Sequence, residues 1–290
     1  MKTILVTGAN GFIGKYIKKF NNFENYNLLY GTTSNLANSD GYIIFDNLYS
    51  NIDIVLKNTD IDIIIHCASI IPHSFEMSDK KLFFNNTIMM TNLSEFAFQK
   101  KLKKFIYLSS FGSMENLEKY DIKDYYTLSK ITGEHICSIM ESKGIEAASL
   151  RISSPFGEFY NKNNVLSLFI DLALQNKTLN VYGSGNRKQN FIYVGNILEY
   201  IECCLENKIS GVHDVVNKNN ISMNQLAQTI VKLCNSMSKI EIGNKKDPLE
   251  NVNLPKYSLI KSKEIDYEEK YTFENALMKY IEYRKGILGI

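Results

Sequence analysis

A tyrosine and a lysine four residues apart form the pair in this chain best suited to acid–base chemistry. They bracket the stretch Tyr126-Thr-Leu-Ser-Lys130, so on a helix both side chains lie on one face. An ammonium group close to a phenol stabilises the phenolate, and we expect it to lower the pKa of Tyr126. The phenol can then donate and accept a proton near neutral pH. Because the chain contains 18 tyrosines, this spacing needs support from its surroundings.

A hydroxyl group lies in the right place to support that pair. Ser109 and Ser110 follow an apolar run at 105–108, which predicts a strand that ends in these two serines. Tyr126 opens the next predicted helix. A serine hydroxyl can hydrogen-bond the same substrate oxygen that the phenol protonates. Ser110, Tyr126 and Lys130 therefore predict oxidation or reduction at an alcohol or ketone carbon, with a separate cofactor that carries the hydride.

The first fourteen residues contain a candidate site for that cofactor. An apolar run at 2–7 leads into Gly8-Ala-Asn-Gly11-Phe-Ile-Gly14, and a helical apolar pattern follows. This order predicts a strand, a tight turn and a helix. The glycines let the backbone turn sharply and let a pyrophosphate approach the N–H groups of the helix N-terminus. We expect a dinucleotide here, contacted by Gly8, Asn10, Gly11, Phe12, Ile13 and Gly14.

Other cofactor contacts are expected where later strands end. Asp46 ends the third predicted strand, where a carboxylate can accept a hydrogen bond from an exocyclic amine. Ala68 lies among small residues after the fourth strand, where a cofactor ribose would pass. The residues Gly31-Thr-Thr-Ser-Asn35, after the second strand, include no carboxylate to bind the ribose of NAD or to repel a 2′-phosphate. Thr33 and Ser34 can donate hydrogen bonds there, so we expect NADP, with NAD as the alternative.

Strands and helices alternate through the first half of the chain. This order predicts a Rossmann-type, doubly wound parallel sheet of the α/β class, with ligands at the carboxyl ends of its strands. The expected strands are 2–7, 27–31, 42–46, 61–66, 105–109 and 146–151, and the expected helices are 48–57, 82–101 and 125–143.

The rhythm changes after Arg151, where loop-like segments interrupt the pattern. Further helices are expected at 165–175, 197–206, 223–235 and 273–284, with a strand at 212–216. We interpret this part as a smaller, discontinuous α/β substrate domain. The predicted dinucleotide-binding domain covers 1–155 and 190–213, and the predicted substrate-binding domain covers 156–189 and 214–290.

Several motifs resemble those of the extended short-chain dehydrogenase/reductases, in the nucleotide-sugar-modifying branch of NAD-dependent epimerases and dehydratases. The resemblance runs nearly from end to end. Some positions depart from the usual pattern: Met89 and Met90 replace Gly-Thr, Ser154 replaces Asn, and Glu158 replaces Pro. The matching segments are Thr7–Gly14, Phe84–Asn86 with Asn92-Leu93, Leu150–Gly157, Gly183–Gly185 and Arg187–Val194.

The resemblance implies roles for individual residues and a class of substrate. It makes Ser110, Tyr126 and Lys130 the catalytic triad, and it makes a nucleoside-diphosphate sugar the substrate. Ser110, Ser154 and Arg187 would contact that substrate, with Arg187 at its phosphates. Gly8, Gly11, Gly14 and Asp46 would bind the cofactor, and Tyr126 and Lys130 would contact it as well.

The residues after Ser110 discriminate among reactions known in this family. Dehydratases of this family resemble one another in an acidic pair directly after the catalytic serine or threonine, and another branch carries a cysteine beside it. In this chain Phe111 and Gly112 occupy these positions, so both the acidic pair and the cysteine are missing. What remains is 4-ketoreduction of an NDP-4-keto-6-deoxy sugar, or 4-epimerisation with bound NAD. Ser113-Met-Glu115 in place of the epimerases' VYG segment, and a short C-terminal part, favour the reductase. A non-catalytic dinucleotide sensor is a third reading, although such proteins typically lose the Tyr or the Lys.

Composition argues against several other classes. A net charge of +2 over 290 residues gives no strong field for nucleic acid or an anionic membrane. The sequence contains no stretch of about 20 apolar residues, so no membrane span is predicted. Five cysteines without CxxC spacing and four scattered histidines predict no metal and a reduced, cytoplasmic setting. The basic run at 100–104 is interpreted as a helix C-terminus. Similar long helices pair across a two-fold axis in the family, which implies a homodimer.

Overall fold

The computed structural model describes residues 1–34, 41–72, 77–112, 124–160, 164–250 and 269–290. Within these residues the chain forms two compact units. Unit 1 contains Met1–Ile152 and Leu198–Val215, and unit 2 contains Ser153–Ile197 with 216–250 and 269–290. Each unit is therefore assembled from separate stretches of sequence. The segment Ser113-Met-Glu115, used above to compare epimerases with reductases, lies outside the described residues.

Unit 1 is built on a sheet of seven strands in the order β11-β6-β5-β4-β1-β2-β3, and every neighbouring pair is parallel. The chain moves outward from β1 in both directions, so the sheet has a switch point between β1 and β4. This confirms the predicted doubly wound fold. The strands are β1 (Lys2–Thr7), β2 (Tyr26–Thr32), β3 (Tyr42–Ile44), β4 (Ile63–His66), β5 (Lys104–Ser110), β6 (Glu146–Ile152) and β11 (Gly211–Val215).

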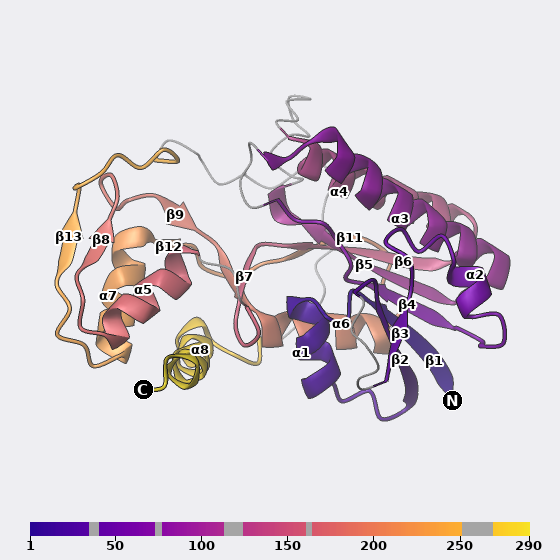
Figure 1. The fold of residues 1–290 in the computed structure, drawn as a ribbon, viewed down its shortest axis with the longest axis horizontal. Coiled ribbons are helices and arrows are strands. Elements are labelled where there is room, and N and C mark those ends of the chain that lie inside the picture. The colour runs from indigo at the N-terminus through magenta and orange to yellow at the C-terminus, as the bar shows by residue number, and fades with distance from the viewer. Residues whose placement is uncertain (35–40, 73–76, 113–123, 161–163, 251–268) are drawn as a thin grey trace. The chain divides into compact units, whose positions relative to one another are not determined.

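Helices cover both faces of this sheet. Helices α2 (Ile52–Val55), α3 (Lys80–Lys100) and α4 (Tyr125–Ser142) lie on one face, and α1 (Phe12–Phe20) lies on the other with α6 (Val194–Glu206) (Figure 1). Apolar residues fill the layer between the sheet and α2, α3 and α4. Among the fully buried side chains there are Leu5, Ile64, Phe96, Phe105 and Met140.

The expected helix at 48–57 is wrong in extent, and so is the expected end of the third strand. Strand β3 ends at Ile44, two residues before Asp46. The Asp46 carboxylate accepts hydrogen bonds from the backbone N–H groups of Leu48 and Ser50, which folds this segment into a turn. Tyr49 then takes a left-handed backbone conformation with φ of 56°. An α-helix cannot pass through that conformation, so α2 begins only at Ile52.

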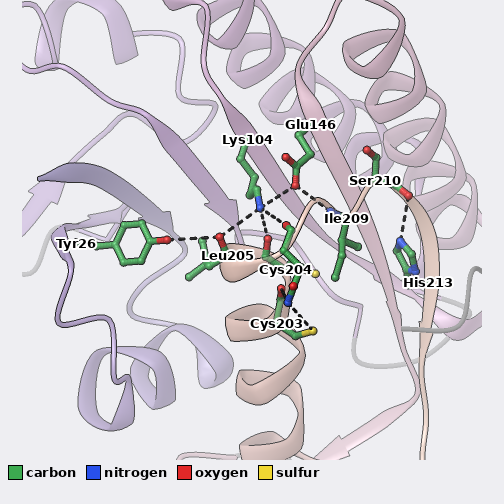
Figure 2. A network of polar contacts seen from close by, with 10 residues as sticks. Tyr26, Lys104, Glu146, Cys203, Cys204, Leu205, Ile209, Ser210 and His213 are labelled. Carbon is green, nitrogen blue, oxygen red and sulfur yellow. Dashed lines mark hydrogen bonds and ion pairs between the residues drawn. The ribbon is translucent and has the colours of Figure 1, made fainter. Parts of the chain in front are cut away.

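The basic run at 100–104 divides between two roles. Helix α3 ends at Lys100, and Lys101 takes a left-handed conformation as its C-cap. Lys104, in contrast, is the first residue of β5 and is only 7% exposed. Its ammonium lies 2.7 Å from a carboxylate oxygen of Glu146 and donates to the backbone carbonyl of Cys204 at the end of α6 (Figure 2). Lys104 therefore compensates the negative end of α6, which corrects the expectation from sequence.

In its described residues, unit 2 contains three short strand pairs and three helices, besides the first residues of α6. Its helices begin at well-formed caps: Asn164 and Ser222 each make a capping box, and Thr272 accepts from the third N–H of the last helix. The helices are α5 (Val165–Leu174), α7 (Met223–Leu233) and α8 (Phe273–Leu288). The pairs are β7 (Ser154–Phe156) with β10 (Phe191–Tyr193), β9 (Lys188–Gln189) with β12 (Ile221–Ser222), and β8 (Leu179–Val181) with β13 (Ile240–Ile242).

An aromatic core holds unit 2 together. The ring of Phe156 lies 5.7 to 5.9 Å from those of Tyr193, Phe273 and Tyr280. Arg284 of α8 forms an ion pair with Asp171 of α5. Across the described part of the whole chain, no helix combines the length and hydrophobicity that a bilayer span requires.

Candidate active site

The glycine-rich loop folds as the sequence predicts. Gly8 follows β1 with φ of +64°, and a side chain there would place its Cβ 2.6 Å from the backbone nitrogen of Ala68. A Cβ on Gly14 would lie 2.4 Å from the carbonyl oxygen of Gly8. The Gly11 N–H donates to that same carbonyl at 2.9 Å. Gly8 and Gly14 must therefore be glycines if the turn is to pass this closely between β1 and α1.

The start of helix α1 fits an anionic ligand. Gly11 is the N-cap, and within the described residues no side chain caps the helix and no acidic residue lies in its first turn. The positive end of the helix dipole is thus not compensated by a carboxylate of its own first turn. Asn10, Phe12 and Ile13 surround this end and are partly exposed. The glycines and the uncapped helix start fit the pyrophosphate of a dinucleotide.

The other predicted cofactor residues follow strands on the same edge of the sheet. Ala68 follows β4, beside Gly8. Thr33 and Ser34 follow β2, and the Ser34 N–H donates to the hydroxyl of Thr32 at 3.2 Å. Asp46 lies beyond β3, and its carboxylate already accepts three hydrogen bonds from Leu48 and Ser50. The parallel topology therefore brings these residues to one edge of the sheet. The Asp46 carboxylate, however, accepts its hydrogen bonds within the turn that contains it.

Ser110, Tyr126 and Lys130 come together at the end of β5 and the start of α4. The Ser110 side chain is close enough to the phenol of Tyr126 to lower its pKa. The Lys130 ammonium lies 5.6 Å from the centre of the Tyr126 ring and donates to the carbonyl oxygen of Leu108 at 2.9 Å. It also lies 5.0 Å from the centre of the Tyr107 ring. The three residues form the predicted constellation, and Tyr107 is an additional neighbour that sequence spacing did not indicate.

Local capping fixes where Tyr126 begins its helix. Asp124 is the N-cap of α4, and its carboxylate accepts from the N–H and the hydroxyl of Thr127. The Ser78 hydroxyl accepts from the Tyr126 N–H at 2.8 Å and donates to Asp124. Asn86 of α3, part of the motif quoted above, donates to Ser129. These contacts hold the first turn of α4 from two sides.

A buried ion pair lies one turn further along α4. The guanidinium of Arg151 on β6 makes two hydrogen bonds to the carboxylate of Glu134, at 2.9 and 2.7 Å. The Ser109 hydroxyl donates to the same carboxylate. Arg151 is completely buried and Glu134 is 6% exposed. Glu134 thus joins α4 to β5 and β6 one helical turn after Lys130.

The pKa values at the site differ from the expectation. Burial raises the pKa of Tyr126 above its usual value, and the Ser110 side chain offsets only part of that rise. The expected lowering of the Tyr126 pKa by Lys130 is therefore wrong for this structure. Burial lowers the pKa of Lys130 to about 8. Burial raises the pKa of the nearby Cys67 to about 12, which keeps this thiol protonated.

The two predicted substrate residues outside the triad lie in unit 2, where Gln189 connects them. The side-chain amide of Gln189 donates to the Ser154 hydroxyl at 2.6 Å and accepts from Arg187 at 3.1 Å. Arg187 also forms an ion pair with Asp247, at 2.7 Å, and Asp247 is 7% exposed. Sequence reasoning missed Gln189 and Asp247. Only the position of Gln189 within the quoted Arg187–Val194 motif could have indicated it.

Comparisons with known proteins show the family of this chain. A model of the NAD-dependent epimerase/dehydratase family matches residues 4–217. A dTDP-D-glucose 4,6-dehydratase of Dictyostelium discoideum is 28% identical over 275 residues, covering 80% of this chain and 62% of that protein. A dTDP-4-dehydro-6-deoxyglucose reductase of Escherichia coli is 23% identical over 192 residues, covering 61% of this chain and 60% of that protein.

Among solved structures, a UDP-N-acetylglucosamine 4-epimerase from Bacillus cereus has a similar fold. Its TM-score is 0.82 at 20% identity, and the alignment covers 99% of this chain and 100% of the other. At this identity the likeness shows a common fold.

Proposed function

The chain belongs to the NAD-dependent epimerase/dehydratase family, and within it we propose an NAD(P)-dependent oxidoreductase that acts on a nucleoside-diphosphate sugar. The proposed reaction is 4-ketoreduction of an NDP-4-keto-6-deoxy sugar. The observation that carries this proposal is the contact of Ser110 with Tyr126 beside Lys130, on the sheet edge that also carries the glycine-rich loop.

The protonation of Tyr126 supports the reductive direction. The bound dinucleotide would supply the hydride. Ser110 would orient the carbonyl oxygen of the substrate, and Tyr126 would donate a proton to it. Because burial raises the pKa of Tyr126, the phenol is protonated at neutral pH, which is the form that a ketone reduction consumes. Lys130 would stabilise the phenolate left behind.

The residues around the triad argue against reactions that need another acid or base. Phe111 and Gly112 directly follow Ser110 and carry no ionisable group. Cys67 is close enough to Lys130 to interact with its charge, but its raised pKa keeps it a thiol. Neither an elimination nor a proton abstraction from a sugar carbon has an obvious base among these neighbours. Acid–base chemistry is left to Tyr126.

The second candidate is 4-epimerisation with tightly bound NAD. The likeness in fold to a 4-epimerase over 99% of this chain favours it. An epimerase would use Tyr126 first as a base and then as an acid, and it would consume no added reductant. A non-catalytic dinucleotide sensor is the third reading, and the retained Ser110, Tyr126 and Lys130 argue against it.

We assign the remaining contacts as proposals. Arg187 would meet the diphosphate of the substrate, and Ser154 would contact the same ligand, with Gln189 holding both side chains in place. Unit 2 would thus be the substrate-binding domain, and unit 1 the dinucleotide-binding domain. For the cofactor we propose NADP. Thr33 and Ser34 can donate hydrogen bonds to a 2′-phosphate, and residues 31–35 include no carboxylate that would repel it.

A panel of nucleotide-linked 4-keto-6-deoxy sugars tests the reaction, with NADPH and NADH absorbance as the readout. Stoichiometric loss of the reductant supports ketoreduction. Isomerisation of a nucleotide sugar without added cofactor supports the epimerase. Tyr126→Phe is the matched variant: an enzyme retains cofactor binding and loses turnover. If the native chain binds a dinucleotide and turns over no sugar of the panel in either assay, the catalytic proposal fails and the sensor reading replaces it.

We also propose that the chain forms a homodimer through α3 and α4. These two helices expose large apolar side chains, including Phe84 at 55%, Ile139 at 50% and Tyr125 at 44%. Such residues are usually covered when they cluster on one surface. Sedimentation of the native chain and of Phe84→Glu tests this proposal. A native chain that sediments as a monomer at micromolar concentration refutes it.

A further inference from the structure

Tyr49 occupies an unusual place for a bulky side chain. It is completely buried, and its φ of 56° lies in the left-handed region, which strains a residue with an aromatic side chain. Its ring packs 5.2 Å from that of Phe45 in the layer between the sheet and α2. A phenylalanine would fill the same space and satisfy the same apolar contacts. The phenolic hydroxyl therefore needs a separate explanation.

That hydroxyl contacts the turn that follows β1. It accepts a hydrogen bond from the Gly8 N–H at 3.1 Å, and it is close enough to the Thr7 side chain for that side chain to lower its pKa. The Thr7 hydroxyl lies 2.8 Å from Nδ1 of His66, at the end of β4, and accepts weakly from the Ala68 N–H at 3.4 Å. The contacts form one continuous series from the segment after β3, through the glycine-rich turn, to the end of β4.

The protonation states give this series a single direction. Burial lowers the pKa of His66 to about 3, so its imidazole is neutral, and burial raises the pKa of Tyr49 to about 12, so it stays a phenol. The Gly8 N–H donates to Tyr49, and the Tyr49 O–H is then available to Thr7. In the tautomer with its proton on Nε2, His66 accepts from the Thr7 hydroxyl. The Gly8 N–H and the Thr7 O–H then each have an acceptor, the Tyr49 O–H faces the Thr7 oxygen, and removal of either hydroxyl leaves one of these hydrogens without an acceptor.

We propose that Tyr49 is a positioning residue of the dinucleotide site: its hydroxyl holds the Gly8 amide from inside the protein and so fixes the turn whose N–H groups face the pyrophosphate. Tyr49 does not itself touch the cofactor. The role rests on the proposed function, because its effect is on dinucleotide affinity. Without the hydroxyl, the Gly8 N–H loses its acceptor, and the turn must reorder before it binds the ligand.

Equilibrium titration of the full chain with NADH, NADPH and ADP-ribose tests this role without measuring turnover. Tyr49→Phe is expected to raise the dissociation constant about tenfold for all three ligands, which corresponds to about 1.4 kcal/mol. ADP-ribose carries the pyrophosphate without nicotinamide, so an equal effect locates the defect at the turn. Thr7→Val should act in the same direction, and Thr7→Ser, which keeps the hydroxyl, should restore affinity.

Ile52→Val is the matched control. Ile52 is 2% exposed in the same apolar cluster as Tyr49, and the substitution removes a methyl group while leaving the hydroxyl series intact. Its dissociation constants should stay within about twofold of native. The proposal is overturned if Tyr49→Phe binds as tightly as native, or if Ile52→Val loses as much affinity as Tyr49→Phe. A native chain that binds none of the three ligands instead refutes the dinucleotide assignment itself, and this role with it.

Discussion

Replacing Lys130 with methionine should make unit 1 more stable at neutral pH while it abolishes turnover. Lys130 is 4% exposed, and burial lowers its pKa from 10.5 to about 8. A shift of this size means that holding the charged form in the folded chain costs about 3 kcal/mol. The methionine also loses the hydrogen bond to Leu108, worth about 1 kcal/mol. We therefore expect Lys130→Met to be about 2 kcal/mol more stable at pH 7.

The gain should vanish at high pH. The folded chain releases the Lys130 proton near pH 8, whereas the unfolded chain holds it to about pH 10.5. Between these values the unfolded state binds more protons, so the native free energy of unfolding rises with pH relative to the variant. The advantage of Lys130→Met should thus shrink by about 3 kcal/mol between pH 8 and pH 10.5. Taking the difference between the two proteins cancels the titration of groups that do not interact with Lys130.

Urea denaturation at pH 7, 8, 9 and 10 measures this difference, followed by circular dichroism and by hydrogen exchange of β5 and β6. Lys81→Met is the control, because Lys81 is exposed on α3 and its substitution should give a difference that does not vary with pH. The reasoning is refuted if Lys130→Met is less stable than native at pH 7 and the deficit does not grow with pH. That result would mean that the contacts of the Lys130 ammonium stabilise the folded chain by more than the burial of its charge destabilises it.

Three further outcomes follow from other contacts. Lys104→Met should lower the free energy of unfolding by about 3 kcal/mol in urea, because it leaves the carboxylate partner unpaired and the end of α6 uncompensated. Glu134→Gln leaves a completely buried arginine with a neutral partner and should cost a similar amount in thermal denaturation. Gly14→Ala places a Cβ 2.4 Å from the Gly8 carbonyl and should weaken NADH binding at least tenfold by titration, whereas Gly286→Ala, with open space around it, should leave binding unchanged.

Local patterns were sufficient for much of the fold. Buried strands of the parallel sheet are continuous apolar runs, so β1, β4 and β5 were placed within two residues of their observed starts. Strands that alternate with helices admit few topologies, which is why the doubly wound sheet could be predicted. Helix α2 failed because the turn before it depends on the Asp46 carboxylate and on the left-handed Tyr49. Propensity rules do not anticipate either feature.

The candidate site was predicted in part for the same reason. Ser110, Tyr126 and Lys130 each sit at the end of a strand or on one face of a helix, and these positions follow from sequence spacing. The pKa values of these residues, in contrast, did not follow from sequence spacing. The pKa of Tyr126 depends on how completely the fold buries the phenol, so an argument from the nearby ammonium gave the wrong direction. The partner of Arg187 was equally hidden, because Asp247 lies 60 residues away.

By itself, the sequence determined which residues could do chemistry: the glycines that allow a close turn, the hydroxyl, phenol and ammonium groups, and the parallel order that carries them to one edge. Those properties reside in residue type and short-range spacing. The tertiary structure decided which groups are charged and which are fixed in place by contacts with other residues. Burial sets the pKa values of Tyr126 and Lys130, and contacts between distant segments join Tyr49 to Gly8 and Glu134 to Arg151. Both depend on chain segments that meet only after folding.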